Sequence, residues 1–194
     1  PVCSSAASDV YKRQGFILSF LGLFGINSSK SESQFFKIEN ILKFSKVSEI
    51  KLKPLRKIEY DSNFSEFNKL IKNKKDASDK YFFVTNNGRW TGFVDENILK
   101  TVSLKKWERN FVGDFKKPID SFETVSHNDK LWRTIERLEE TNEGFLLVLN
   151  AANIPLGIID RSKIGNFVLN KLGFNLSSDI VNKLNFKNHY PLGI

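Results

Sequence analysis

The sequence predicts an α/β protein made of two similar units, each with the order strand, helix, strand, strand, helix. The first observation is a hairpin pattern that occurs twice, as YFFVTNNGRWTGFVD at residues 81–95 and GFLLVLNAANIPLGIID at residues 144–160. The second is that residues with helical spacing precede and follow each hairpin. A unit of about 60 residues cannot bury the apolar face of one small sheet alone. We therefore expect two halves that pack with pseudo-twofold symmetry around a cleft.

The first unit opens with a strand candidate, RKIEY, and the segment NFSEFNKLI then places Phe64, Phe67, Leu70 and Ile71 at helical spacing. Two strands follow, KYFFVTN and RWTGFVD, and Asn87-Gly88 between them is the signature of a two-residue hairpin turn. A second helix is predicted from its apolar residues, which are Ile98, Leu99 and Val102.

The second unit repeats this order, beginning with the strand candidate DSFETVS. Its first helix, DKLWRTIERLEE, has Leu131, Ile135 and Leu138 on one face. The hairpin strands are GFLLVLN and IPLGIID, and the last helix carries Ile164, Phe167, Val168 and Leu172. One extra residue between the apolar strand and the glycine of the next strand predicts a looser turn than the first one.

The residues before the two units are of a different kind. Residues 1–14 resemble a translated sequencing adapter, so we expect them to be an artefact without structure, and they hold the only cysteine, Cys3. Residues 15–27 contain the uncharged run GFILSFLGLFGI, predicted to be the end of a membrane span that begins upstream; a buried or interfacial helix is the alternative. The chain has no Met and is expected to be a fragment. Residues 28–46 are predicted to be a polar linker, NSSKSESQ, followed by an amphipathic helix, FFKIENILKF.

The net charge of +8 is either spread over solvated faces or gathered into a functional patch. The densest stretch is residues 43–57, with six basic residues against one acid, Glu49. Basic residues directly after a membrane span favour the cytoplasmic side and attract anionic head groups. We therefore expect a membrane protein with this region in the cytoplasm. Nucleic acid is not expected as a partner, because the remaining charge is scattered and the tryptophans are irregularly spaced.

The sequence contains no recognisable catalytic or metal-binding motif. A zinc protease of the H-E-x-x-H type needs two histidines one helical turn apart, whereas His127 and His189 are far apart. His127 is predicted to lie in an exposed turn before a helix, and Asp129 is interpreted as an N-terminal helix residue. We therefore assign no catalytic residue and no metal ligand to this chain.

The two hairpins, each followed by a helix, resemble a tandem pair of CBS domains, also called a Bateman module. The resemblance places the first unit at residues 47–108, the second at 109–173 and a C-terminal tail at 174–194. The tail FVLNKLGFNLSSDIVNKLNFKNHYPLGI, with RWTGFVDENILKTVSLKKW and IIDRSKIGNFVLNKLG, resembles the C-terminal part of cyanobacterial site-2 protease-like zinc metalloproteases of the M50 class.

This resemblance implies a regulatory module of an intramembrane protease that modulates proteolysis through ligand or partner binding. Zinc, its ligands and the catalytic Glu would lie in the upstream part, and the partners would be the membrane, the protease core and a second copy through the CBS units. The alternative is an adenosine-ligand-sensing module of a channel or transporter, and a free-standing soluble module is a third interpretation.

The resemblance also points to a ligand cleft, with Gly92, Asp95, Gly157, Asp160 and Arg161 as its candidate residues. The resemblance implies that adenine nucleotides would be bound through the pattern Gly-apolar-apolar-Ser/Thr-x-x-Asp, which runs from the second hairpin strand into the next helix. In this chain Asp95 and Asp160 stand at the hydroxyl position, while Ile98 and Lys163 stand at the last one. A carboxylate repels phosphate, so helix N-capping competes with nucleotide binding as the role of both aspartates. Arg161 and Lys163 would still offer positive charge to an anion at a helix N-terminus.

Overall fold

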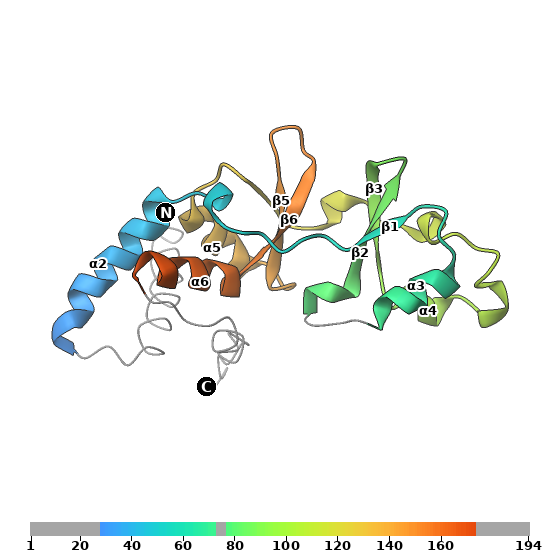
Figure 1. Ribbon diagram of the computed structural model, residues 1–194, viewed down its shortest axis with the longest axis horizontal. Helices are drawn as coiled ribbons and strands as arrows, with labels where there is room; N and C mark the ends of the chain where they lie inside the picture. Colours follow the sequence, from blue (N-terminus) through green and yellow to red (C-terminus); the bar gives the residue numbers. More distant parts are fainter. Residues whose placement is uncertain (1–27, 73–76, 174–194) are drawn as a thin grey trace, which may run out of the picture. The chain divides into compact units, whose positions relative to one another are not determined.

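The computed structural model describes residues 28–72 and 77–173 (Figure 1). The predicted artefact, the predicted end of a span and the C-terminal tail all lie outside these residues. The described chain divides into two compact units. We call residues 28–52, 126–145 and 159–173 the helical unit, and residues 53–72, 77–125 and 146–158 the sheet unit. These units interleave along the chain, and the sequential repeat boundaries given above stay a prediction.

The helices and strands follow the predicted order through both repeats (Figure 1). Before the repeats comes α2 (Ser28–Phe44). The first repeat contains β1 (Lys57–Glu59), α3 (Phe64–Ile71), β2 (Tyr81–Asn86), β3 (Arg89–Asp95) and α4 (Ile98–Thr101). The second contains β4 (Thr124–Ser126), α5 (Leu131–Glu140), β5 (Phe145–Leu149), β6 (Pro155–Asp160) and α6 (Arg161–Lys171).

Two three-stranded sheets are formed, in the orders β1-β2-β3 and β4-β5-β6. In the first, β1 runs parallel to β2, and β2 pairs antiparallel with β3. The turn between β2 and β3 has Asn87 at φ 49° and Gly88 at φ 76°. Both values lie in the left-handed region that this turn requires, so the predicted two-residue turn is confirmed. The mixed α/β class and the strand-helix-strand-strand-helix order are confirmed as well.

The β1-β2-β3 sheet has apolar side chains on both faces. One face packs on α3, with a buried cluster of Ile58, Phe64, Phe67, Phe82, Val84, Val94, Val102 and Val112. The other face is aromatic: the rings of Phe93 and Phe122 lie 4.2 Å apart, and those of Tyr81 and Phe122 lie 4.9 Å apart. This use of both faces explains why β2 reads as a continuous apolar run rather than as an alternating strand.

The helical unit is built by α2, α5 and α6, which contact one another (Figure 1). Ile38 and Leu42, one helical turn apart, form the buried stripe of α2 and have no exposed surface. The predicted polar linker NSSKSESQ is wrong, because α2 already begins at Ser28. The physical reason is that residues 28–44 contain no Gly or Pro that would stop the helix. Once the buried stripe anchors the helix, each residue added toward its N-terminus forms one more hydrogen bond.

One further difference concerns the length of a helix. The helix predicted around Ile98 is only four residues long and ends before Val102, which is its C-cap. Across residues 28–72 and 77–173, none of the helices combines the length and the apolar character needed to span a bilayer. The uncharged run at residues 15–26 lies outside these ranges, so the predicted span is untested.

Candidate ligand-binding residues

Four of the five predicted cleft residues lie at equivalent places in the second strands of the two hairpins, and the fifth directly follows the second hairpin. Gly92 and Gly157 lie inside β3 and β6, and Asp95 and Asp160 are the last residues of these strands. Arg161 opens α6. Gly92, Asp95 and Gly157 belong to the sheet unit, whereas Asp160 and Arg161 belong to the helical unit.

Gly92 is placed where another backbone segment approaches β3 closely. Phe93 and Lys117 exchange two backbone hydrogen bonds, of 2.9 Å from Phe93 N and 2.7 Å from Lys117 N. A Cβ at Gly92 would lie 2.5 Å from the Lys117 carbonyl oxygen, inside van der Waals contact. A glycine within a strand often marks such an approach. The packing of the connector between the repeats is therefore sufficient reason for Gly92, without a ligand.

Asp95 has a local role that differs from the predicted one. Its Oδ1 accepts a hydrogen bond of 2.6 Å from Asn97 N, which closes a turn two residues long. The N-cap position of α4 is Asn97, so the prediction that Asp95 caps this helix is wrong. The reason is that the chain makes this turn before it enters the helix, which shifts the helix start to Ile98.

Asp160 is the N-cap of α6, as one of the two sequence interpretations predicts. Its backbone is extended, and its Oδ1 accepts a hydrogen bond of 2.8 Å from Lys163 N. The carboxylate thus satisfies a backbone donor that the helix itself leaves without an acceptor. An anion that approached the start of α6 would meet this carboxylate, so Asp160 works against the usual attraction of a helix N-terminus for phosphate.

Arg161 is held by an ion pair inside the helical unit. Its Nη2 lies 3.0 Å from Glu139 Oε2 on α5, and both side chains are largely shielded from solvent. The Arg161 Nε is buried and has no hydrogen-bond partner among the described residues. The Nε–H group of Arg161 therefore remains available as a hydrogen-bond donor, although Glu139 balances the charge of the guanidinium.

Gly157 is buried in the middle of β6. The next residue, Ile158, exchanges two backbone hydrogen bonds of 2.9 Å with Lys53. Residue 53, which precedes β1 in the chain, is thus added to the edge of β6. Sequence periodicity did not predict this pairing, because one residue pair leaves no alternating pattern.

Lys53 and Asp79 form a partly buried ion pair that the sequence did not predict. Lys53 Nζ lies 2.9 Å from Asp79 Oδ1, with side-chain exposures of 18% and 8%. Arg56 donates to the Asp79 carbonyl at 3.0 Å and to the Leu70 carbonyl, and its guanidinium lies 4.2 Å from the ring centre of Phe82. These contacts hold the segment before β1 against α3 and against the turn that precedes β2. The basic run at residues 43–57 was the only sequence signal, and it does not identify the acidic partner.

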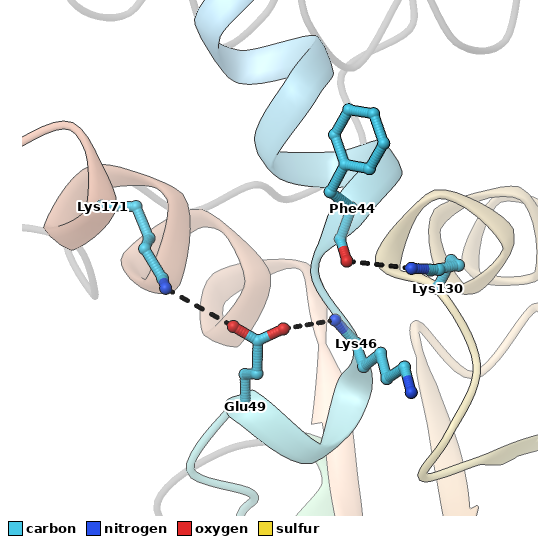
Figure 2. A network of polar contacts seen from close by, with 5 residues as sticks. All are labelled: Phe44, Lys46, Glu49, Lys130 and Lys171. Carbon is cyan, nitrogen blue, oxygen red and sulfur yellow. Dashed lines mark hydrogen bonds and ion pairs between the residues drawn. The ribbon is translucent and has the colours of Figure 1, made fainter.

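Glu49, the one acidic residue among residues 43–57, forms a polar network in the helical unit (Figure 2). Glu49 accepts hydrogen bonds from Lys46 N at 2.9 Å and from Lys171 Nζ at 3.4 Å. The Lys46 backbone hydrogen bond, more than any other contact, lowers the pKa of Glu49; Lys171 and Lys130 lower it further, and partial desolvation opposes them. The network ties the 3₁₀ turn Val47–Glu49 to the last turn of α6.

His127 and Asp129 both lie in the turn before α5. No three His, Cys, Asp or Glu side chains gather as metal ligands within residues 28–72 and 77–173. His127 lies in the turn before α5, but it is half-buried rather than exposed as predicted. Asp129 accepts from Ser126 N at 3.1 Å in the same turn and precedes the helix, so its predicted place as a helix residue is wrong. The reason is that the Ser126–Asp129 turn delays the helix to Leu131.

The described residues have the CBS-domain fold, with two three-stranded sheets and helices in a mixed α/β chain. No family model and no curated protein matches the sequence. Among solved structures, the CBS domain of the bacterial CNNM/CorC family Mg2+ transporter is similar, with a TM-score of 0.53 and 13% identity over 86% of this chain and 97% of that chain.

Two further solved structures are similar to a comparable degree. The same transporter domain in complex with ATP has a TM-score of 0.53 and 14% identity, covering 72% of this chain and 97% of that chain. A protein from Methanocaldococcus jannaschii has a TM-score of 0.52 and 17% identity, covering 73% of this chain and 69% of that chain. At these identities the likeness establishes the fold.

Proposed function

We propose that this chain is a regulatory CBS-pair module that communicates with the polypeptide upstream of it through α2. The observation that carries the proposal is the docking of α2 on α5 and α6, with Ile38 and Leu42 fully buried. The helix that leaves the module toward the N-terminus is thereby packed against helices of the second repeat.

The segment after α2 strengthens this connection. Val47 N donates to the Asp129 carbonyl at 3.0 Å, and Ser48 N donates to the His127 carbonyl at 2.8 Å. In return, Leu131 N donates to the Ser45 carbonyl at 3.0 Å. These bonds link residues 45–48 to the turn that begins α5. A displacement of α5 or α6 is therefore transmitted to α2. A ligand can cause such a displacement only if its affinities for the two arrangements of these helices differ.

The ligand class that we propose is an adenine nucleotide or another small anion. The support is the similar transporter domain that has been solved with ATP, together with the basic residues Arg161 and Lys163 at the start of α6. The contacts would differ from those of the motif described above, because Asp160 is occupied by capping Lys163 N. Backbone donors and the basic side chains would carry the binding.

For the complete protein we propose an intramembrane zinc metalloprotease of the site-2 class, with this module on the cytoplasmic side. The support is the sequence resemblance of the tail, the uncharged run at residues 15–26 and the basic stretch after it. Zinc would belong to the upstream part. The second candidate is a module of a membrane transporter, favoured by the structural likeness to a Mg2+ transporter domain.

The test uses the complete protein, reconstituted in vesicles, with and without residues 47–172. Deletion is expected to change the rate or the substrate choice of proteolysis for the protease, or the flux of ions for the transporter. The milder variant Leu42→Ala should move activity in the same direction, because it weakens the docking of α2 while leaving the module in place. Leu104→Ala, the same change at a leucine that is 73% exposed, is the matched control. Activity that is unchanged by the deletion would refute a regulatory role.

A further inference from the structure

The side of α2 that faces away from α5 and α6 carries two exposed aromatic rings. Phe36 is 55% exposed and Phe44 is 71% exposed, although both belong to a helix whose Ile38 and Leu42 are completely buried. At about 100° per residue, Phe36, Asn40 and Phe44 fall within an arc of about 80°. This arc is centred opposite the buried stripe.

Lysines border this arc on both sides. Lys37 and Lys43 are exposed on α2 next to the two rings, and Lys43 is paired with Glu39 at 2.6 Å. Lys130 lies beside the helix end, where its Nζ donates to the Phe44 carbonyl at 3.0 Å, and Lys46 is exposed just after the helix (Figure 2). The Phe44 ring points away from this polar network (Figure 2). We call Phe36, Lys37, Asn40, Lys43 and Phe44 the outer face of α2.

An exposed apolar side chain on its own needs no explanation, because much of any protein surface is apolar. Two phenylalanines on one stripe with lysines at its borders are a different pattern, which is typical of helices that lie in the plane of a membrane surface. The place of α2 in the chain agrees with this pattern. The twelve uncharged residues 15–26 end next to Asn27, directly before the helix starts at Ser28.

We propose that the outer face of α2 lies on the surface of a lipid bilayer that contains anionic lipids. The Phe36 and Phe44 rings enter the boundary between head groups and acyl chains, and Lys37, Lys46 and Lys130 contact lipid phosphates. The opposite stripe stays on α5 and α6. Charge complementarity and the adjacent uncharged run select lipid as the occupant of this face. The proposal does not depend on the regulatory role.

The first experiment measures the position of residue 44 directly. Phe44→Trp is introduced into the 194-residue chain, and quenching of tryptophan fluorescence is recorded with vesicles of brominated phosphatidylcholine and phosphatidylglycerol. The wild type is measured in parallel to subtract Trp90, Trp107 and Trp132. Leu104→Trp is the control, because Leu104 is 73% exposed in the sheet unit. Quenching of the new signal at residue 44 but not at 104 is expected. No quenching at 44, or equal quenching at both, overturns the proposal.

The second experiment measures binding to vesicles by flotation. Lys37→Gln with Lys46→Gln should weaken binding to anionic vesicles by about fivefold for each lysine, and leave binding to zwitterionic vesicles unchanged. Lys105→Gln with Lys106→Gln removes the same charge from exposed lysines of the sheet unit and should have no such effect. Equal losses for the two pairs would contradict a specific face. All chains contain residues 15–26, so direct binding by that run is common to them.

The third variant, Phe36→Ser with Phe44→Ser, separates lipid from a second copy of the chain as the occupant. We expect weaker vesicle binding and an unchanged sedimentation coefficient in the absence of lipid. A change of oligomeric state with unchanged vesicle binding would assign the face to a second copy and overturn the lipid proposal. None of these measurements involves nucleotide or the activity of the complete protein, so their failure leaves the regulatory proposal intact.

Discussion

At the scale of single residues, the clearest result is that small local contacts already explain most of the suspected ligand residues. Gly92 makes room for the Lys117 carbonyl, Asp95 closes a turn and Asp160 caps α6. Arg161 is paired with Glu139 through Nη2, while its Nε has no hydrogen-bond partner among the described residues. A nucleotide that binds near these residues would have to use groups that the fold does not already employ.

Gly92→Ala is expected to destabilise the protein by about 1–3 kcal/mol, because the new methyl group would overlap the connector backbone. Urea unfolding of the wild type and the variant measures the difference. Arg89→Ala is the control, since it lies in the same strand with an exposed side chain. A fully stable Gly92→Ala variant with impaired nucleotide binding would instead favour a ligand role.

Tyr60 gives a pH-dependent prediction. Its hydroxyl donates to Asp114 Oδ1 at 2.5 Å, and this hydrogen bond is the main reason that the pKa of Tyr60 is raised above its ordinary value of 10.0. A raised pKa in the folded state means that the contribution to stability is present below pH 10.0 and is lost as pH rises through the folded value.

Spectrophotometric titration of the tyrosines tests this prediction. In Asp114→Asn, one tyrosine should ionise at lower pH than in the wild type, and stability above pH 10 should fall less steeply with pH. Tyr60→Phe should remove the same titration step. Identical alkaline titration curves for the wild type and Asp114→Asn would show that the hydrogen bond does not hold the proton.

At the scale of elements, α2 is the part of the chain whose role changes most between sequence and structure. Its periodic residues predict an amphipathic helix, and the tertiary contacts make it a docked helix with a free outer face. Its attachment has two components, the apolar stripe on α5 and α6 and the polar network around Glu49. The two can be weakened separately.

Leu42→Ala tests the apolar component. Truncation of a fully buried leucine costs about 2–5 kcal/mol, and the loss should appear as faster amide exchange in α2. Asn40→Ala on the exposed side of the helix should change neither exchange nor unfolding by more than about 0.5 kcal/mol. Unaltered exchange in α2 of Leu42→Ala would argue that its docking does not depend on this stripe.

Glu49→Gln tests the polar component through pH. The pKa of Glu49 is lowered from 4.5, chiefly by the Lys46 backbone hydrogen bond, so its ionised form stabilises the fold above pH 4.5. This contribution disappears as pH falls through the lower, folded value. We therefore expect the wild type to exceed Glu49→Gln in unfolding free energy at neutral pH, with the gap closing in acid. A constant gap across this range, measured by urea unfolding, would contradict the assignment.

At the scale of the whole molecule, the fold is that of tandem CBS domains, and the proposed role predicts that a ligand stabilises it. Titration of the chain with AMP, ATP and S-adenosylmethionine should raise the melting temperature for at least one of them, since a ligand that binds only the native state adds to its stability. At one hundred times the dissociation constant the gain is about 2.7 kcal/mol. Arg161→Gln should reduce this shift, and Arg133→Gln on α5 is the control. No shift with any of the three compounds would leave a protein partner as the regulator.

The sequence alone determined the kinds of elements, their order and the first hairpin turn, because these follow from periodicity and from residues such as Asn87-Gly88 that act on their own neighbours. It also predicted that Asp160 caps a helix. Only the tertiary structure decided why Gly92 is a glycine, that Lys53 pairs with Asp79 and that α2 docks on α5 and α6. The physical reason is that each of these depends on segments far apart in the chain, and such contacts leave no periodic trace in the residues that make them.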